Sequence, residues 1–201
     1  GDICIWAHLR IIEQNPAPVI TQPGPVVVGY CERHRHDVLP YLSPVHSPLG
    51  CTAIYMRKEG ITGSIASISP CIAKKEEHKV TGLIEYNITY NGLLHYLEEK
   101  GIALPAEESG FDHPDAGPGS LFPLPGGLQE NLEFFLGNQL HIEKAEGSSV
   151  FKYLTQYAKT EKEFLPDVFD VVSCGNGCLI GTGCKKEQNI YKLSWQKEKG
   201  R

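Results

Sequence analysis

Apolar residues recur at helical spacing in several stretches of the chain. Ile5, Leu9 and Ile12 fall on one face of a helix predicted over 3–14, which Pro16 ends. The segment 26–36 starts with three valines, but its length and charged end, with Pro25 before it, favour a helix over a strand. Further helices are predicted at 47–58, 90–100, 128–136 and 151–160.

Short apolar runs lie between these predicted helices. The run 63–69 consists of small and apolar residues, fits a buried strand and leads through Pro70 into Cys71. The run 167–173 fits a second buried strand and leads directly into Cys174. Shorter strands are expected at 19–22 and 82–89, and the segment 109–127, rich in Gly, Pro and Asp, is expected to be a loop. Strands that alternate with helices predict an α/β fold with parallel sheets.

The cysteines gather where these strands end. Ligands of parallel α/β proteins bind at the carboxyl ends of the strands, so Cys71 and Cys174 are expected to converge on one edge. Cys174 is followed by Gly-Asn-Gly and then Cys178, with further glycines at Gly181 and Gly183. Glycines let the backbone wrap closely around a cluster and direct its N–H groups at sulfur. This pattern predicts an iron–sulfur site.

Composition narrows the class of protein. The net charge of -5 gives no sign of the basic surface that nucleic-acid binding requires. No apolar run has the length of a membrane helix, and the first ten residues lack the pattern of a secretory signal. We therefore expect a cytoplasmic protein without a nucleic-acid or membrane partner. Seven cysteines in a reducing compartment favour metal binding or redox chemistry over disulfides.

Other roles for the cysteines remain open at this point. Cys71, Cys174, Cys178 and Cys184, or a histidine in place of one, could form a tetrahedral zinc site. The chain lacks the paired CxxC knuckles that are usual in structural zinc sites. A second group of cysteines is expected to be buried as small apolar side chains: Cys4, Cys31 and Cys51.

Four segments, in order along the chain, resemble the C-terminal catalytic domain of FeFe (iron-only) hydrogenases. They are 39–48, 69–77, 116–131 and 172–183. The sequences of 22–25 and 45–48 resemble most closely a sensory branch of that family, in which the domain accompanies signalling modules. The resemblance implies a two-lobed α/β fold with parallel sheets flanked by helices. It also implies a single domain over 1–201, truncated at both ends relative to the family.

The resemblance assigns metal ligands. It implies that Cys71, Cys174 and Cys178 hold a [4Fe–4S] cluster. It also implies that Cys178 lies nearest a di-iron subcluster with CO and cyanide ligands, if that subcluster is present.

Three further residues match positions that serve catalysis in the family. Lys74 would donate to a cyanide ligand of the di-iron unit, as a compact charge with three donors. Glu77 matches a carboxylate close to the same site, and Ser43 matches a hydroxyl on the proton route. The alternative for this charged stretch is a solvated helix start, which we expect for Lys75 and Glu76.

The sequence also departs from the family. Gly24 stands where the first signature has a cluster-ligating cysteine, and Pro23 stands where the family has a proton-relaying cysteine. Trp6 and its neighbours replace the acidic relay residues. The fourth ligand would then come from Cys184, Cys31, a histidine, water or a small molecule. We expect a Gly24→Cys variant to retain more cluster; no gain would mean that another residue already supplies the fourth ligand.

These observations predict a hydrogenase-like iron–sulfur domain with a sensory or electron-transfer role and weak or no hydrogen turnover. Its partner would be a redox protein or a signalling module. One alternative is a working FeFe hydrogenase, 2H⁺ + 2e⁻ ⇌ H₂, within a longer chain. Another is a zinc-binding or metal-free interaction module.

Overall fold

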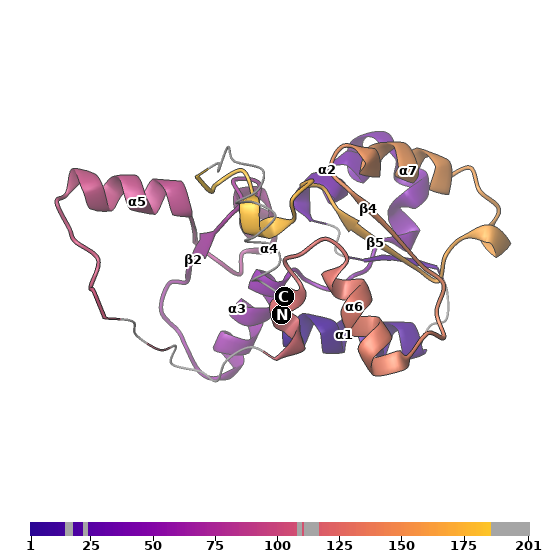
Figure 1. Ribbon diagram of the computed structural model, residues 1–201, viewed down its shortest axis with the longest axis horizontal. Helices are drawn as coiled ribbons and strands as arrows, with labels where there is room; N and C mark the ends of the chain where they lie inside the picture. Colours follow the sequence, from indigo (N-terminus) through magenta and orange to yellow (C-terminus); the bar gives the residue numbers. More distant parts are fainter. Residues whose placement is uncertain (15–17, 22–23, 108–109, 111–116, 186–201) are drawn as a thin grey trace.

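Two parallel sheets form the framework of the protein. The computed structural model describes residues 1–14, 18–21, 24–107, 110 and 117–185. The three-stranded sheet has the order β1 (Val19–Thr21), β5 (Val168–Val172), β4 (Ile142–Glu146). The two-stranded sheet pairs β2 (Ala66–Ser69) with β3 (Tyr86–Thr89). Figure 1 shows the two sheets in different halves of the molecule, with helices against them. The α/β class with parallel sheets is therefore confirmed.

The α-helices of the described residues match the helices predicted from the apolar pattern, except α4 (Lys74–Thr81), which is charged and was not predicted. They are α1 (Asp2–Gln14), α2 (Pro25–His34), α3 (Pro48–Lys58), α4 (Lys74–Thr81), α5 (Tyr90–Glu99), α6 (Gly127–Leu136) and α7 (Ser149–Tyr157). The ambiguous segment after Gly24 is a helix with Pro25 in its first turn, as interpreted. Ser47 caps α3, since its hydroxyl accepts a hydrogen bond from the Gly50 N–H at 3.3 Å. Of the predicted loop at 109–127, residues 110 and 117–127 are described; they include a short 3-10 helix (Pro118–Leu121) and lead into α6 at Gly127.

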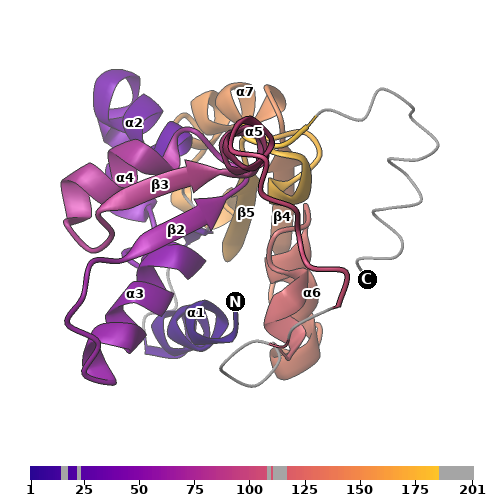
Figure 2. The same ribbon diagram turned by 90° about the vertical axis from the view of Figure 1, so that its left-hand side faces the viewer.

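The two-stranded sheet is shorter than its apolar runs predict, and Figure 2 shows β2 and β3 side by side. β2 begins at Ala66 and β3 at Tyr86. The carboxylate of Glu85 accepts a hydrogen bond from the Ile65 N–H at 2.6 Å and binds Arg57 at 3.2 Å. The Glu85 side chain therefore occupies the Ile65 N–H, which would otherwise be free for the strand pairing. The pairing starts one residue further on, between Ala66 and Tyr86.

Strand β4 was not predicted. Its sequence is Ile-Glu-Lys-Ala-Glu, and of these side chains only Ala145 is buried. The strand lies at the edge of its sheet, where it pairs with β5 alone. An edge strand carries charged side chains without penalty, so the hydrophobic pattern gives little sign of it.

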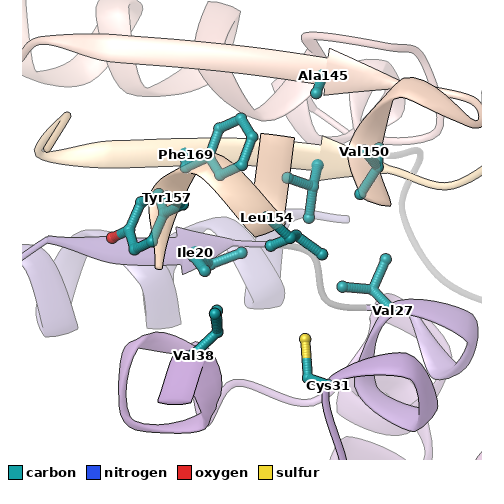
Figure 3. Close-up of a cluster of buried hydrophobic side chains, with 10 residues drawn as sticks. Ile20, Val27, Cys31, Val38, Ala145, Val150, Leu154, Tyr157 and Phe169 are labelled. Atoms are coloured by element: carbon teal, nitrogen blue, oxygen red, sulfur yellow. The ribbon is translucent and has the colours of Figure 1, made fainter. Parts of the chain in front are cut away.

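The three-stranded sheet is covered on both faces. On one face, Ile20 and Phe169 pack with residues of α2 and α7, and Figure 3 shows the Cys31 thiol directed into this core. On the other face, Val168 packs with Leu9 of α1 and Leu128 of α6. Two-sided covering explains why all five residues of β5 are buried. It places the carboxyl end of β5, and Cys174 after it, at a fixed position.

One buried carboxylate in this framework makes stability depend on pH. Asp170 of β5 is 1% exposed, and its carboxylate accepts a hydrogen bond from the Gln129 N–H at 3.3 Å. Burial raises the pKa of Asp170 from 3.8 to about 6, against the opposing effects of that bond and of Lys144. The folded state therefore binds its proton more tightly than the unfolded state does.

We expect the Asp170→Asn variant to be more stable than the wild type above pH ~6. Between pH ~4 and ~6 the wild type loses about 3 kcal/mol, because the carboxyl ionises in the unfolded state while the buried carboxyl still holds its proton. An amide has no such proton to lose. Urea unfolding from pH ~4 to ~8 measures the difference between the two proteins. Slopes from other groups, such as His8, cancel in that difference. A difference that stays constant with pH would contradict this assignment.

Candidate cluster-binding site

Cys71 lies in a loop that β3 holds in place. It follows β2 after Pro70, and its N–H donates to the Ser69 hydroxyl at 3.3 Å. The Asn87 amide of β3 donates to the Cys71 carbonyl at 3.0 Å, and the Ser69 hydroxyl donates to the Asn87 side-chain oxygen at 2.7 Å. The loop position is thus fixed by two polar side chains of neighbouring strands.

Cys174 and Cys178 lie in the glycine-rich turn that follows β5. The Gly177 N–H donates to the Cys174 carbonyl at 3.0 Å, which closes the turn. The Cys178 N–H donates to the Pro123 carbonyl at 2.7 Å, in the loop before α6. Gly177 has φ +68°, and a Cβ there would lie 2.4 Å from the Pro123 carbonyl oxygen. Only glycine fits this close approach, so the turn is held against the rest of the fold.

The chain then crosses from the first sheet to the second. The Gly183 N–H donates to the Pro70 carbonyl at 2.7 Å, and the Gly183 carbonyl accepts from the Asn91 N–H at 2.9 Å. The Thr182 hydroxyl accepts from the Ile72 N–H at 3.2 Å. In Figure 1 this segment is yellow and lies between the sheets, and Figure 2 shows it beside α5. It connects the loop of Cys174 and Cys178 to the loop of Cys71.

We expect Gly183→Ala to loosen this contact. A Cβ at Gly183 would lie 2.8 Å from the Thr89 side chain and 3.1 Å from the Pro70 backbone. Overpacking of this kind destabilises by about 1–3 kcal/mol. Urea unfolding, with hydrogen exchange at the Gly183 and Asn91 amides, checks it. Gly63→Ala is the matched control, since a Cβ at Gly63 meets nothing within 4 Å. Equal effects of the two substitutions would contradict the tight contact.

The thiols lie close enough to affect one another's ionisation. Burial raises the pKa of Cys178 to about 11, Lys74 lowers it, and Cys174, Cys71 and Cys184 raise it further. Burial also raises the pKa of Cys174, and Cys71 contributes in the same direction. These three cysteines lie in loops that follow strands of both sheets, and that they hold one cluster stays a prediction.

Lys74 and Glu77 form an ion pair at the start of α4. Lys74 Nζ lies 2.5 Å from Glu77 Oε2, and the two side chains are 13% and 15% exposed. Their neighbours Lys75 and Glu76 are exposed, as expected of a solvated helix start. Burial distinguishes the two residues assigned to the site from the two that are not, and Lys74 directs its charge toward Cys178.

Ser43 and Glu77 line one cleft. The cleft has a volume of about 600 Å³ and lies between α2, the segment 43–47 and α4. Ser43 is buried; its N–H donates to the Ile20 carbonyl at 2.8 Å, and its hydroxyl accepts from the Val45 N–H at 3.2 Å. Ser43 and Glu77, two of the residues that the family resemblance assigns to the site, thus border the same cleft.

Gly24 forms the start of α2 and has open space around it. An added Cβ at this position would meet nothing within 4 Å. Pro23, which stands at the family's relay cysteine, lies outside the described residues. Trp6 points away from the interior: it is 56% exposed, and its ring packs at a tilt against Phe135 with centroids 5.0 Å apart.

Two thiols and a histidine form a buried polar group that the sequence pattern did not predict. Cys4 and Cys51 are buried, as expected, but each sulfur also lies near the His46 carbonyl, at 3.4 and 3.2 Å. Their mutual hydrogen bond, followed by burial, raises the pKa of Cys4. Burial lowers the pKa of the adjacent His8 to about 4. Cys4 and His8 are four residues apart on α1, so the sequence places them on one face of that helix. Cys51 joins them only because α1 packs on α3.

A group suited to a single metal ion is not among these clusters. In the described ranges, no three His, Cys, Asp or Glu side chains are placed to hold one metal ion. The same ranges contain no helix long and apolar enough to cross a membrane.

The structure defines the class as an α/β protein with two parallel sheets, in which the strands β2 and β5 lead into loops that carry cysteines. The profile of a family described as iron only hydrogenase large subunit, C-terminal domain, matches residues 7–153. The chain belongs to this family. A search of curated proteins finds no match.

Solved structures of FeFe hydrogenases share the fold. One is HydA(ΔEFG), described for stepwise H-cluster assembly, with a TM-score of 0.68 and 20% identity over 100% of this chain and 69% of that chain. Another, described for oxygen inactivation through the H-cluster 2Fe subcluster, has a TM-score of 0.69 and 19% identity over 100% and 70%. A variant of HydA1 from Chlamydomonas reinhardtii has a TM-score of 0.66 and 18% identity, over 100% of this chain and 70% of that chain.

Proposed function

We propose that this chain is a hydrogenase-like iron–sulfur domain whose Cys71, Cys174 and Cys178 bind a [4Fe–4S] cluster. Its role is sensory or electron-transferring, with weak or no hydrogen turnover. The observation that supports the proposal is the hydrogen bond between Gly183 and Pro70, which joins the loop after β5 to the loop after β2. Convergent thiols from distant segments are what a cubane requires.

The residues present fit this group. Thiols are the protein ligands of iron–sulfur clusters, and the glycine turn between Cys174 and Cys178 leaves no side chain to obstruct it. Lys74 supplies a positive charge beside Cys178, which offsets the negative charge of a thiolate-bound cluster. When bound, such a cluster exchanges single electrons. A di-iron subcluster, named for one of the structural relatives, would lie next to Cys178 with Lys74 and Glu77 beside it.

Slow turnover follows from the proton route. Proline has no side-chain proton, so Pro23 cannot relay one to the site. Protons would reach the Lys74–Glu77 pair through the cleft that Ser43 lines. Without rapid proton delivery, the domain is suited to respond to a reduction potential through a redox partner or a signalling module.

Anaerobic reconstitution of the full chain with iron and sulfide tests the proposal. We expect about four irons per chain and the EPR signal of a reduced cubane. Binding of zinc alone, or of no metal, would overturn it in favour of the interaction module. After maturation with a di-iron mimic, infrared bands of CO and cyanide report the subcluster. Hydrogen evolution as fast as in efficient hydrogenases would instead establish the working enzyme.

A further inference from the structure

Cys184 lies at the same point of convergence as the three proposed ligands. We infer that Cys184 is the fourth thiolate of the cluster and takes the place of the ligand that is missing at Gly24. The inference rests on the cluster proposed above. It gives the site a complete set of cysteine ligands, drawn from two loops.

Backbone geometry places Cys184 beside Cys71. The Gly183 N–H donates to the Pro70 carbonyl at 2.7 Å. Cys184 directly follows Gly183 in the sequence, and Cys71 directly follows Pro70. The Cys184 N–H donates to the Gly181 carbonyl at 3.1 Å, so the turn that presents Cys184 is closed. A Cβ at Gly181 would lie 2.3 Å from the Pro70 carbonyl oxygen. The glycines thus allow this turn to press directly on the Cys71 loop.

The Cys184 thiol is held only weakly. Its sulfur makes a long contact of 3.5 Å with the Leu179 carbonyl, within its own turn. Its side chain is half-buried rather than packed in a core. The thiol is therefore close to the site and held there only weakly.

Cys31, the other cysteine considered for this role, lies elsewhere. Its side chain is fully buried between α2 and the three-stranded sheet, among Val27, Val38 and Leu154. The charged groups that act on it are Arg35, Asp37 and Glu32, with no cluster cysteine among them.

The chemistry of ligation is a simple exchange. Each thiol loses a proton as its sulfur bonds to iron, and no electron is transferred in that step. Four thiolates leave no open iron for water or a small molecule. A closed cluster is suited to electron exchange rather than to substrate binding at its own irons.

Iron and sulfide analysis with EPR of the reconstituted full chain tests this inference in Cys184→Ala. We expect the wild type to hold about four irons per chain, with an EPR signal that added thiols or imidazole do not change. In Cys184→Ala we expect conversion on mild oxidation to a three-iron cluster, with its distinct EPR signal, and a response to those added ligands. Cys31→Ala is the control for loss of one thiol, and circular dichroism checks folding.

The outcomes separate the two proposals. A wild type without a cluster overturns the proposed function and this inference with it. A cubane that is identical in the wild type and in Cys184→Ala overturns the inference alone. So does a wild-type signal that shifts with added ligand, since that iron would be open. Gly24→Cys gives a further check: a closed site predicts no gain in iron, whereas a gain contradicts the fourth thiolate at Cys184.

Discussion

Cys178→Ala abolishes the cluster: reconstituted protein should contain less than about one iron per chain, against about four in the wild type. The Cys178 N–H is bonded to the Pro123 carbonyl of another loop, so Cys178 is a firmly placed ligand, whereas the Cys184 sulfur makes only a long contact within its own turn. The backbone bond from its N–H to the Pro123 carbonyl does not depend on the side chain, and the fold should persist. Metal analysis and EPR under anaerobic conditions give the result.

Cys31→Ala controls for the loss of a thiol that does not face the site. It removes a buried sulfur from the core near Val38 and lowers stability, yet it should leave the iron content unchanged. If both variants lost iron equally, the effect would come from weakened folding and not from ligation.

Lys74→Met has the second large effect, since it leaves the Glu77 carboxylate half-buried without its partner. Exposed ion pairs contribute up to about 1 kcal/mol, and breaking a fully buried pair costs about 3–5 kcal/mol. For side chains 13% and 15% exposed we expect a loss of about 2 kcal/mol in the free energy of unfolding. In reconstituted protein the reduction potential should also fall, because a nearby cation favours the more negative, reduced cluster.

Two companion variants isolate the cause of the Lys74→Met effect. Lys75→Met removes an exposed charge from the same turn and should change stability by less than about 0.5 kcal/mol. Lys74→Met/Glu77→Leu removes both charges and should recover most of the stability, and the reduction potential should rise part of the way back because a nearby anion is lost as well. Urea unfolding and a redox titration followed by EPR measure both quantities. A Lys74→Met protein as stable as the wild type would contradict a buried pair.

Much of the fold could be predicted from local patterns. Pro25 at a helix start and the apolar run before Cys174 identified α2 and β5, because both signals are contained in a few neighbouring residues. Strand β4 could not be predicted, since its position at a sheet edge tolerates charge at Lys144. The length of β2 depended on a hydrogen bond from Ile65 to Glu85, which are twenty residues apart.

The candidate site divides in the same way. Strand ends and glycines indicated that Cys71 and Cys174 converge, because parallel strands direct their carboxyl ends to one edge. The partners that fix the loops, Pro123 and Asn87, come from segments without any motif of their own. The neighbourhood of Cys184 depends on the crossing between the two sheets, which is a property of the whole fold.

Mössbauer spectroscopy of the chain reconstituted with isotopically enriched iron tests the central claim most directly, because it reports the coordination of every iron at once. The account predicts a spectrum of about four irons per chain in one cluster, all with tetrahedral sulfur coordination. Iron bound outside a cluster, or a sample that takes up no iron while its fold is intact, would contradict it.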